Sequence, residues 1–132
     1  MTLYKKSSAA WATIGYHKIY YRSLWERNYA RFLEWQKQCG FIEDWQHEPE
    51  TFWFLEIKRG VRSYLPDFKV INNDQTHYWV EVKGFMDSKS VTKLKRFKKY
   101  YPQEKIIIIS SKWFSDNNQK MRLIIPTWET GV

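Results

Sequence analysis

Two carboxylates and a lysine in the middle of the chain have the types and the spacing for metal-assisted chemistry. Asp67 lies in the segment 64–71, Glu81 and Lys83 lie in 78–83, and apolar and polar side chains alternate along both segments. This alternation predicts a hairpin with one apolar face and one face that carries the three charges. Mg²⁺ takes carboxylates, water and substrate phosphate as ligands, and a neighbouring lysine offsets charge that develops on phosphate. The alternative is an amphipathic hairpin whose charged face is only solvated.

The predicted hairpin needs a particular register if Asp67 and Glu81 are to bind one ion. Directly opposed residues of an antiparallel pair point to the same side of the sheet, and both positions are odd-numbered. We therefore expect a loop with an odd number of residues, about three or five, around 73–75.

The composition is that of one basic, globular domain. The chain has 132 residues, 43% hydrophobic and 19% aromatic, which predicts a single domain over 1–132. Lysine and arginine number 22 against 14 acidic residues, and the resulting charge of +8 favours DNA over a membrane as partner. Without a membrane-length apolar run or a secretory signal, we expect an intracellular, cytoplasmic protein. The single Cys39 excludes an internal disulfide and a cysteine-based zinc cluster.

A helix ahead of the hairpin supplies a third candidate carboxylate. Apolar residues recur at helical spacing from Ser23 until Gly40, and Ser23 with Glu26 fits a capping box. Glu26 lies at the margin of the apolar stripe, so its side chain can point along the edge of the core toward the sheet. Helix cap and catalytic ligand are therefore alternative roles for Glu26.

The other segments predict an α/β domain. Residues 1–15 are expected to form a mobile or dimer-forming arm, and 16–21 a short strand. After the first helix we expect a connector at 41–50 anchored by Trp45, and then strands at 51–58, 61–71 and 78–83. A second helix is expected to start at Asp87 or Ser88 and to end at Pro102. It is followed by a predicted strand at 105–110 that is buried on both faces, and by an edge strand at 120–126. The core is then a helix, a three-stranded antiparallel meander, a helix and a strand.

The second predicted helix has a strongly basic face. Val91, Leu94, Phe97 and Tyr101 form its expected buried stripe, and no acidic residue occurs between positions 88 and 103. We expect the basic face to follow DNA phosphates, with a solvated charge face as the alternative. The candidate DNA-binding residues are Lys89, Lys93, Lys95, Arg96, Lys98 and Lys99 on the helix, and Arg59, Arg62 and Lys69 flanking the hairpin.

The motif and the order of elements resemble those of the PD-(D/E)XK nuclease superfamily. Pro66-Asp67 is followed by Glu81-Val82-Lys83, and the two parts fall on the second and third strands of the predicted meander. These segments and the one around Glu26 are similar to small phage and bacterial members, namely phage endonuclease I, Holliday junction resolvases and the endonuclease subunit of transposases. The resemblance covers roughly 16–110 and implies a restriction-endonuclease-like core, with a mixed central sheet flanked by helices.

The resemblance also implies roles for individual residues. Asp67 and Glu81 would ligate Mg²⁺, for which Mn²⁺ would substitute, and the Val82 carbonyl would add an oxygen. Glu26 would bind a second ion or a metal-bound water, and Lys83 would position the nucleophile. The histidines are scattered and are expected to be surface or hydrogen-bonded residues rather than ligands: His17, His47 and His77.

Together these features predict a Mg²⁺-dependent DNA endonuclease. Because the chain has no separate sequence-reading module, we expect selectivity for branched or Holliday junction DNA, and two active sites acting together would require a homodimer. One alternative is a nicking or transposition-type nuclease directed by a partner protein. Another is a non-catalytic nucleic-acid-binding module of the same fold, against which Asp67 and Glu81 count, because carboxylates repel phosphates.

Overall fold

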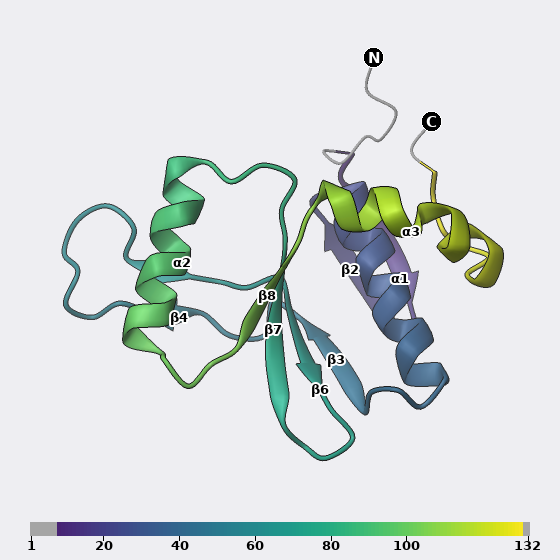
Figure 1. Cartoon of the computed structure of the whole chain (residues 1–132), viewed down its shortest axis with the longest axis horizontal. Helices are drawn as coiled ribbons and strands as arrows, with labels where there is room; N and C mark the ends of the chain where they lie inside the picture. Colours follow the sequence, from purple (N-terminus) through teal and green to yellow (C-terminus); the bar gives the residue numbers. More distant parts are fainter. Residues whose placement is uncertain (1–7, 131–132) are drawn as a thin grey trace.

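The computed structural model describes residues 8–130, which form an α/β fold with three helices and a mixed central sheet (Figure 1). The helices are α1 Leu24–Gln38, α2 Ser88–Tyr100 and α3 Ser111–Ile124. The strands are β1 Ala10–Ile14, β2 His17–Tyr21, β3 Asp44–His47, β4 Phe52–Trp53, β5 Ser63–Tyr64, β6 Phe68–Ile71, β7 His77–Val82 and β8 Ile106–Ile109. Within this part of the chain, no helix is long and apolar enough to cross a membrane.

The central sheet has the strand order β3-β6-β7-β8, in which β8 is parallel to β7 and the other neighbours are antiparallel. Phe68 is the partner of Val80, and the loop between β6 and β7 covers 72–76, with a backbone hydrogen bond of 2.8 Å across its ends. The predicted odd loop length is therefore confirmed. Continued by one residue, this register sets Asp67 opposite Glu81 on one face of the sheet.

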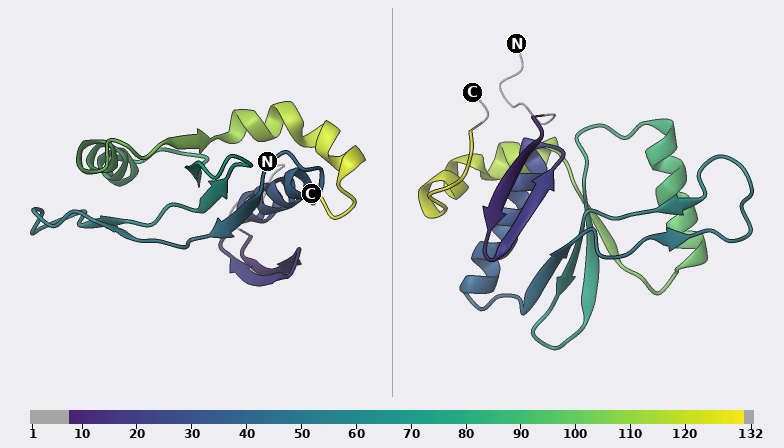
Figure 2. Two further views of the ribbon diagram at one scale, coloured as in Figure 1. Left: turned by 90° about the horizontal axis from the view of Figure 1, so that it is seen from below. Right: turned by 180° about the vertical axis from the view of Figure 1, so that it is seen from behind.

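Two hydrophobic clusters cover opposite faces of the sheet, and Figure 2 shows the layers from the edge. The first, here the α1 cluster, joins the sheet to α1, α3 and the β1–β2 hairpin; the second, the α2 cluster, joins it to α2 and to β4 and β5. Val80 belongs to the α1 cluster and Trp79 to the α2 cluster, because successive strand residues point to opposite faces. The face that carries Glu81 is thus not simply solvated, since Trp79 is only 1% exposed.

Residues 10–21 form a hairpin against α1, in part where a mobile arm was predicted. β1 pairs with β2 through a turn at Gly15, whose φ of 61° lies in the left-handed region that glycine adopts easily. Ile14 and Tyr21 are buried in the α1 cluster, and this apolar contact holds the hairpin in place. Residues 10–14 are therefore a paired strand rather than a mobile arm, whereas a role of this segment in a dimer stays a prediction. Residues 1–7 lie outside the described residues.

The first strand of the central sheet lies in the segment predicted as a connector. β3 pairs with β6, and Trp45, the predicted anchor, is fully buried. The predicted strand 51–58 contributes only the two residues of β4, which pair with β5 in a separate ribbon. Pro49 and Pro66 separate this ribbon from the sheet, because proline cannot donate a ladder hydrogen bond. In Figure 1 the ribbon extends outward beneath α2.

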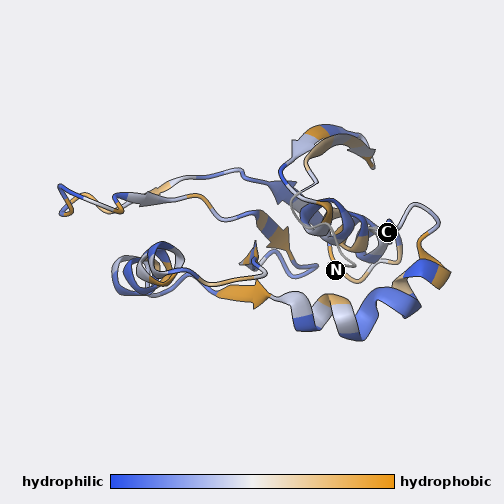
Figure 3. Cartoon of the chain, turned by 90° about the horizontal axis from the view of Figure 1, so that it is seen from above, coloured by the Kyte–Doolittle hydropathy of each residue, from blue (hydrophilic) through white to orange (hydrophobic). Residues whose placement is uncertain are grey.

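The C-terminal part of the chain differs from prediction in two ways. β8, an orange arrow in Figure 3, is an edge strand of the sheet. It is not buried on both faces, because Ile107 and Ile108 are 42% and 38% exposed. The predicted edge strand at 120–126 is instead mostly the end of α3. Phe114 and Met121, two helical turns apart, are buried in the α1 cluster, which explains why this segment is helical.

The second predicted helix is present, and its predicted buried stripe is confirmed except at Val91, since Leu94 and Tyr101 pack with Phe97 in the α2 cluster. Asp87 is the N-cap, and its Oδ1 accepts a hydrogen bond from the Ser90 N–H at 2.7 Å. Phe97 is fully buried as predicted, whereas Val91 is 40% exposed. The α2 cluster contacts only the later turns of the helix, so its first turns are free to lie beside the end of the sheet. There, Lys93 faces a small pocket that Glu81 also lines.

Candidate active site

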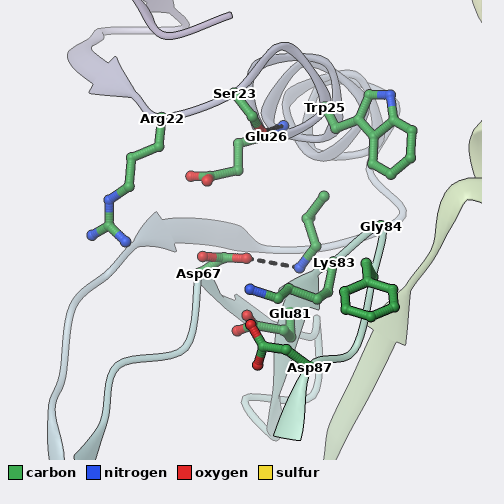
Figure 4. A pocket seen from close by; sticks show the side chains of 11 residues that line it. Arg22, Ser23, Trp25, Glu26, Asp67, Glu81, Lys83, Gly84 and Asp87 are labelled. Carbon is green, nitrogen blue, oxygen red and sulfur yellow. Dashed lines mark hydrogen bonds between the residues drawn. The ribbon is translucent and has the colours of Figure 1, made fainter. Parts of the chain in front are cut away.

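A cleft of about 420 Å³ opens at the end of β7, between the first turn of α1 and the segment that leads into α2 (Figure 4). Three elements supply its carboxylates, since Glu26 comes from α1, Asp67 precedes β6 and Glu81 comes from β7. Its lining residues are Arg22, Ser23, Trp25, Glu26, Asp67, Glu81, Val82, Lys83, Gly84, Phe85 and Asp87. The cleft therefore contains all of the side chains that were predicted to be catalytic.

Asp67 is the most buried of the three carboxylates, at 6% exposed. Its Oδ2 accepts a hydrogen bond of 2.7 Å from the Val82 N–H on the neighbouring strand. Burial, together with the nearby carboxylates of Glu81 and Glu26, holds the pKa of Asp67 well above its usual range, although the Val82 N–H acts in the opposite direction. In the absence of a cation, a negative charge on Asp67 is therefore costly.

Glu81 is held from behind by a buried tyrosine. The Tyr64 hydroxyl, in the α2 cluster, donates a 2.5 Å hydrogen bond to Glu81 Oε1. Burial raises the pKa of Glu81, and the bond from Tyr64 and the charges of Lys83 and Lys93 oppose that rise. Burial and the neighbouring Glu81 also raise the pKa of Tyr64, so this phenol stays a neutral donor at physiological pH.

The backbone N–H of Glu26 takes part in the N-cap of α1, and the Glu26 side chain lines the cleft. The Glu26 N–H donates to Ser23 Oγ at 3.1 Å, which confirms the N-cap at Ser23. The carboxylate oxygen Oε2 lies 3.4 Å from Nε2 of His47, a residue of β3 whose side chain is 7% exposed. His47 is thus a buried partner of Glu26, as expected of a hydrogen-bonded histidine.

The three carboxylates share one arrangement. Each places one oxygen against a buried group: Asp67 against the Val82 N–H, Glu81 against the Tyr64 hydroxyl and Glu26 against His47. Among residues 8–130, no lysine or arginine forms an ion pair with any of them. The same part of the chain has no group of three His, Cys, Asp or Glu arranged as a ready metal site. The donor chemistry, all oxygen and partly desolvated, still fits a hard divalent cation.

Cationic side chains surround the carboxylates without neutralising them directly. Lys83 lines the cleft beside Glu81, and its backbone N–H donates to the Ile109 carbonyl at 2.9 Å, which fixes the chain at the end of β7. Lys93 approaches Glu81 from α2. Arg22 lines the opposite side of the cleft and forms an ion pair with Glu48. Positive side chains thus lie on three sides of the carboxylates.

The predicted DNA-binding residues do not form one surface. Four of the helix residues are exposed as expected: Lys89, Lys95, Lys98 and Lys99. Arg96 is half-buried, and its Nη1 donates to the Val61 carbonyl, so it fastens α2 to the ribbon. Lys69 does not flank the cleft, because its Nζ lies 5.6 Å from the centre of the Trp79 ring, in a hollow shared with Glu104. Arg59 and Arg62 are exposed on the outer ribbon.

Sequence reasoning missed three contributors to the cleft. Tyr64 and His47 were not assigned to it, and Arg22 was treated only as a link to α1. Strand alternation along 64–71 puts Tyr64 and Asp67 on opposite faces, so this pattern does not predict the hydrogen bond from Tyr64 to Glu81. The positions of His47 and Arg22 depend on β3 lying beside β6 and on the hairpin lying against α1, which no local pattern encodes.

Comparisons of the chain with protein-family models, with curated proteins and with solved structures found no match. The functional interpretation therefore depends on the geometry of the cleft itself.

Proposed function

We propose that this protein is a metal-dependent DNA endonuclease of the PD-(D/E)XK type, which hydrolyses phosphodiester bonds. The observation that carries the proposal is the convergence of three carboxylates, each anchored through one oxygen, on a cleft that also holds Lys83. The chain order of the core supports it too: α1, the antiparallel strands β3, β6 and β7, then α2 and the parallel strand β8. That order is the one expected of a restriction-endonuclease-like core.

The cleft residues have complementary tasks in this reaction. Hydrolysis joins a water oxygen to phosphorus and breaks the bond to one ester oxygen, which takes up a proton. Asp67 and Glu81, with the Val82 carbonyl, would hold a Mg²⁺ or Mn²⁺ ion, which supplies a Lewis acid and neutralises phosphate charge. Glu26 faces the same space from α1 and orients water, while Lys83 stabilises the negative charge that develops on the phosphate oxygens.

DNA is the proposed substrate because cations lie around the acidic cleft and on the adjacent helix. Arg22 and Lys93 border the carboxylates, and the exposed lysines of α2 extend the positive surface outward. The described fold provides no separate module that reads base sequence, which favours selection by DNA structure, such as a branch or a junction.

A cleavage assay with a matched variant tests the proposal. Purified protein would be incubated with duplex, flap and four-way-junction DNA, with Mg²⁺, Mn²⁺ or EDTA. We expect the parent to cut at least the branched substrates in either metal and not in EDTA, and Asp67→Asn to be inactive. Asp116→Asn, which alters an exposed carboxylate on α3, should cut like the parent. If the parent cuts no DNA with either metal while binding it, the non-catalytic binding module replaces this proposal.

A further inference from the structure

An exposed pair of aromatic rings lies on the outer face of the β1–β2 hairpin. Trp11 and Tyr20 are cross-strand partners, and they are 63% and 49% exposed. Their ring centroids are 5.6 Å apart with an interplanar angle of 66°, an edge-to-face contact. Large exposed aromatic surfaces that touch one another are typical of binding sites rather than of solvated faces.

The hairpin orients these rings outward because its other face is used for folding. Ile14 and Tyr21 are buried in the α1 cluster, and Ala12 and Ile19 pack against it. Strand alternation then forces their neighbours to point away from α1. Neither Trp11 nor Tyr20 is needed to fill that cluster, although their edge-to-face contact helps to pair β1 with β2.

The position of the pair connects it to the cleft. It lies at the open end of the hairpin, where β2 leads through Arg22 into the first turn of α1 (Figure 2, right). Arg22 lines the cleft, and its side chain is 65% exposed. Arg22 therefore links the strand that carries Tyr20 to the lining of the cleft.

The surroundings of the pair are positively charged. Lys18, on the same outer face, places its Nζ 5.9 Å from the centre of the Trp11 ring. The hairpin, residues 10–21, carries Lys18 and no carboxylate of its own. Arg22, which follows the hairpin, forms an ion pair with Glu48 and is still 65% exposed. Aromatic side chains can stack on unpaired bases, and neighbouring cations can contact the phosphates, so this combination suits single-stranded nucleic acid.

We propose that Trp11 and Tyr20 form a stacking surface for unpaired bases, and that Arg22 contacts the phosphate between those bases and the cleft. The partner is a DNA strand that is single-stranded next to a duplex, as at a flap, a fork or a junction. The inference relies on the proposed function for DNA as the ligand, and it adds the part of the substrate that selects for branched structure. Base stacking requires only the flat face of a ring, so this surface accepts any base sequence.

Binding measured in EDTA tests the inference separately from cleavage. Fluorescence anisotropy would compare a labelled blunt duplex with the same duplex carrying a single-stranded tail, for the parent and for Trp11→Ile/Tyr20→Ile. Isoleucine keeps strand propensity and apolar surface but has no ring. We expect affinity for the tailed DNA to fall by about five- to a hundredfold per stacked base, and affinity for the blunt duplex to stay within about twofold.

Two further variants make the result decisive. Trp11→Phe/Tyr20→Phe keeps two rings and should bind tailed DNA nearly as the parent does. Phe41→Ala removes a ring that is 62% exposed and that lies just after the C-terminal end of α1. This control should leave the affinities for tailed and for blunt DNA unchanged. Thermal unfolding would establish that each variant is folded.

Three results would overturn the inference. In the first, the isoleucine variant keeps its preference for tailed DNA. In the second, the isoleucine variant loses affinity for tailed and for blunt DNA by the same factor, which indicates that the rings contact DNA of either form and do not stack on unpaired bases. In the third, it changes the oligomeric state in solution, which assigns the rings to an interface between copies of the chain. A parent that binds tailed DNA through these rings but cuts nothing would refute the nuclease proposal and leave this inference standing.

Discussion

The acidic cleft and the outer surface of α2 hold their charges in opposite ways. Asp67 and Glu81 are partly or fully desolvated, and each is fixed by a hydrogen bond to one oxygen. The outer lysines of α2, namely Lys89, Lys95, Lys98 and Lys99, are exposed, and the helix has no acidic residue to pair with them. A charge that is buried and fixed costs folding energy but is ready to act in a transition state, whereas a solvated charge costs little and attracts polyanions from a distance. The cleft should therefore control reaction rate, and the surface should control affinity.

The largest expected effect is loss of cleavage in Lys83→Ala. This variant leaves the carboxylates in place, so the proposed metal ligands remain and DNA should still bind. We expect the single-turnover rate with excess protein to fall by at least about a hundredfold, or about 3 kcal/mol of transition-state stabilisation. Lys120→Ala, on the exposed side of α3, is the control and should cut at the parental rate. Parental cleavage by Lys83→Ala would mean that this lysine is only part of the binding surface.

A smaller loss of rate is expected from Glu26→Gln. The N-cap bond uses the backbone N–H of Glu26 and not its carboxylate, so thermal stability should hardly change. If the carboxylate orients water or an ion, the cleavage rate should fall at least about tenfold. Glu43→Gln, an exposed carboxylate that precedes β3, is the matched control. Unchanged cleavage with unchanged stability would leave Glu26 with no role beyond its backbone cap.

The energetic cost of the buried carboxylates predicts that Asp67→Asn stabilises the metal-free fold at neutral pH. Because the pKa of Asp67 is raised in the folded state, the fold keeps a proton that the unfolded chain releases above its carboxyl pKa of about 3.9. The free energy of unfolding of the parent should therefore fall as pH rises from about 4 toward the raised pKa.

Asparagine has no charge and can still accept a hydrogen bond from the Val82 N–H. The free energy of unfolding of Asp67→Asn should therefore not show this fall with rising pH. Thermal unfolding in EDTA at pH 4 and pH 7 measures the difference. The melting temperature of the variant should exceed that of the parent at pH 7, and the gap should narrow at pH 4. A variant that is less stable than the parent at pH 7 contradicts the assigned cost.

The smallest effects separate the lysines of α2 from one another. The sequence grouped Lys93 with Lys95 and Lys98, but Lys93 lies beside Glu81 while the other two are exposed. Lys95→Gln/Lys98→Gln should weaken DNA binding a few-fold and flatten its salt dependence by roughly 0.9 in log-log slope for each phosphate that is no longer neutralised. Lys93→Gln should instead lower the rate at saturating DNA more than it lowers affinity. Equal behaviour of the two variants would remove the distinction between cleft and surface at this helix.

Local pattern predicted the elements that carry the site. α1, with its N-cap at Ser23, β7 and the odd loop 72–76 all follow from the spacing of apolar residues and from turn chemistry, which depend on near neighbours in the chain. Because the side-chain period of a strand is two, the register alone brought Asp67 and Glu81 to one face. Residue type and spacing were thus enough to single out the three carboxylates and Lys83.

Long-range packing decided what local pattern did not contain. The run of isoleucines in β8 looks doubly buried, yet the strand is at the edge of the sheet, because burial depends on which elements lie beside it. The identity of β3, the helical fold of 111–124 and the position of Lys93 beside Glu81 likewise depend on distant partners. The sequence by itself determined which groups can do chemistry here, since residue type and strand period are local properties. Only the tertiary structure decided which groups anchor them, because Tyr64, His47 and Val82 reach the carboxylates from other elements or neighbouring strands.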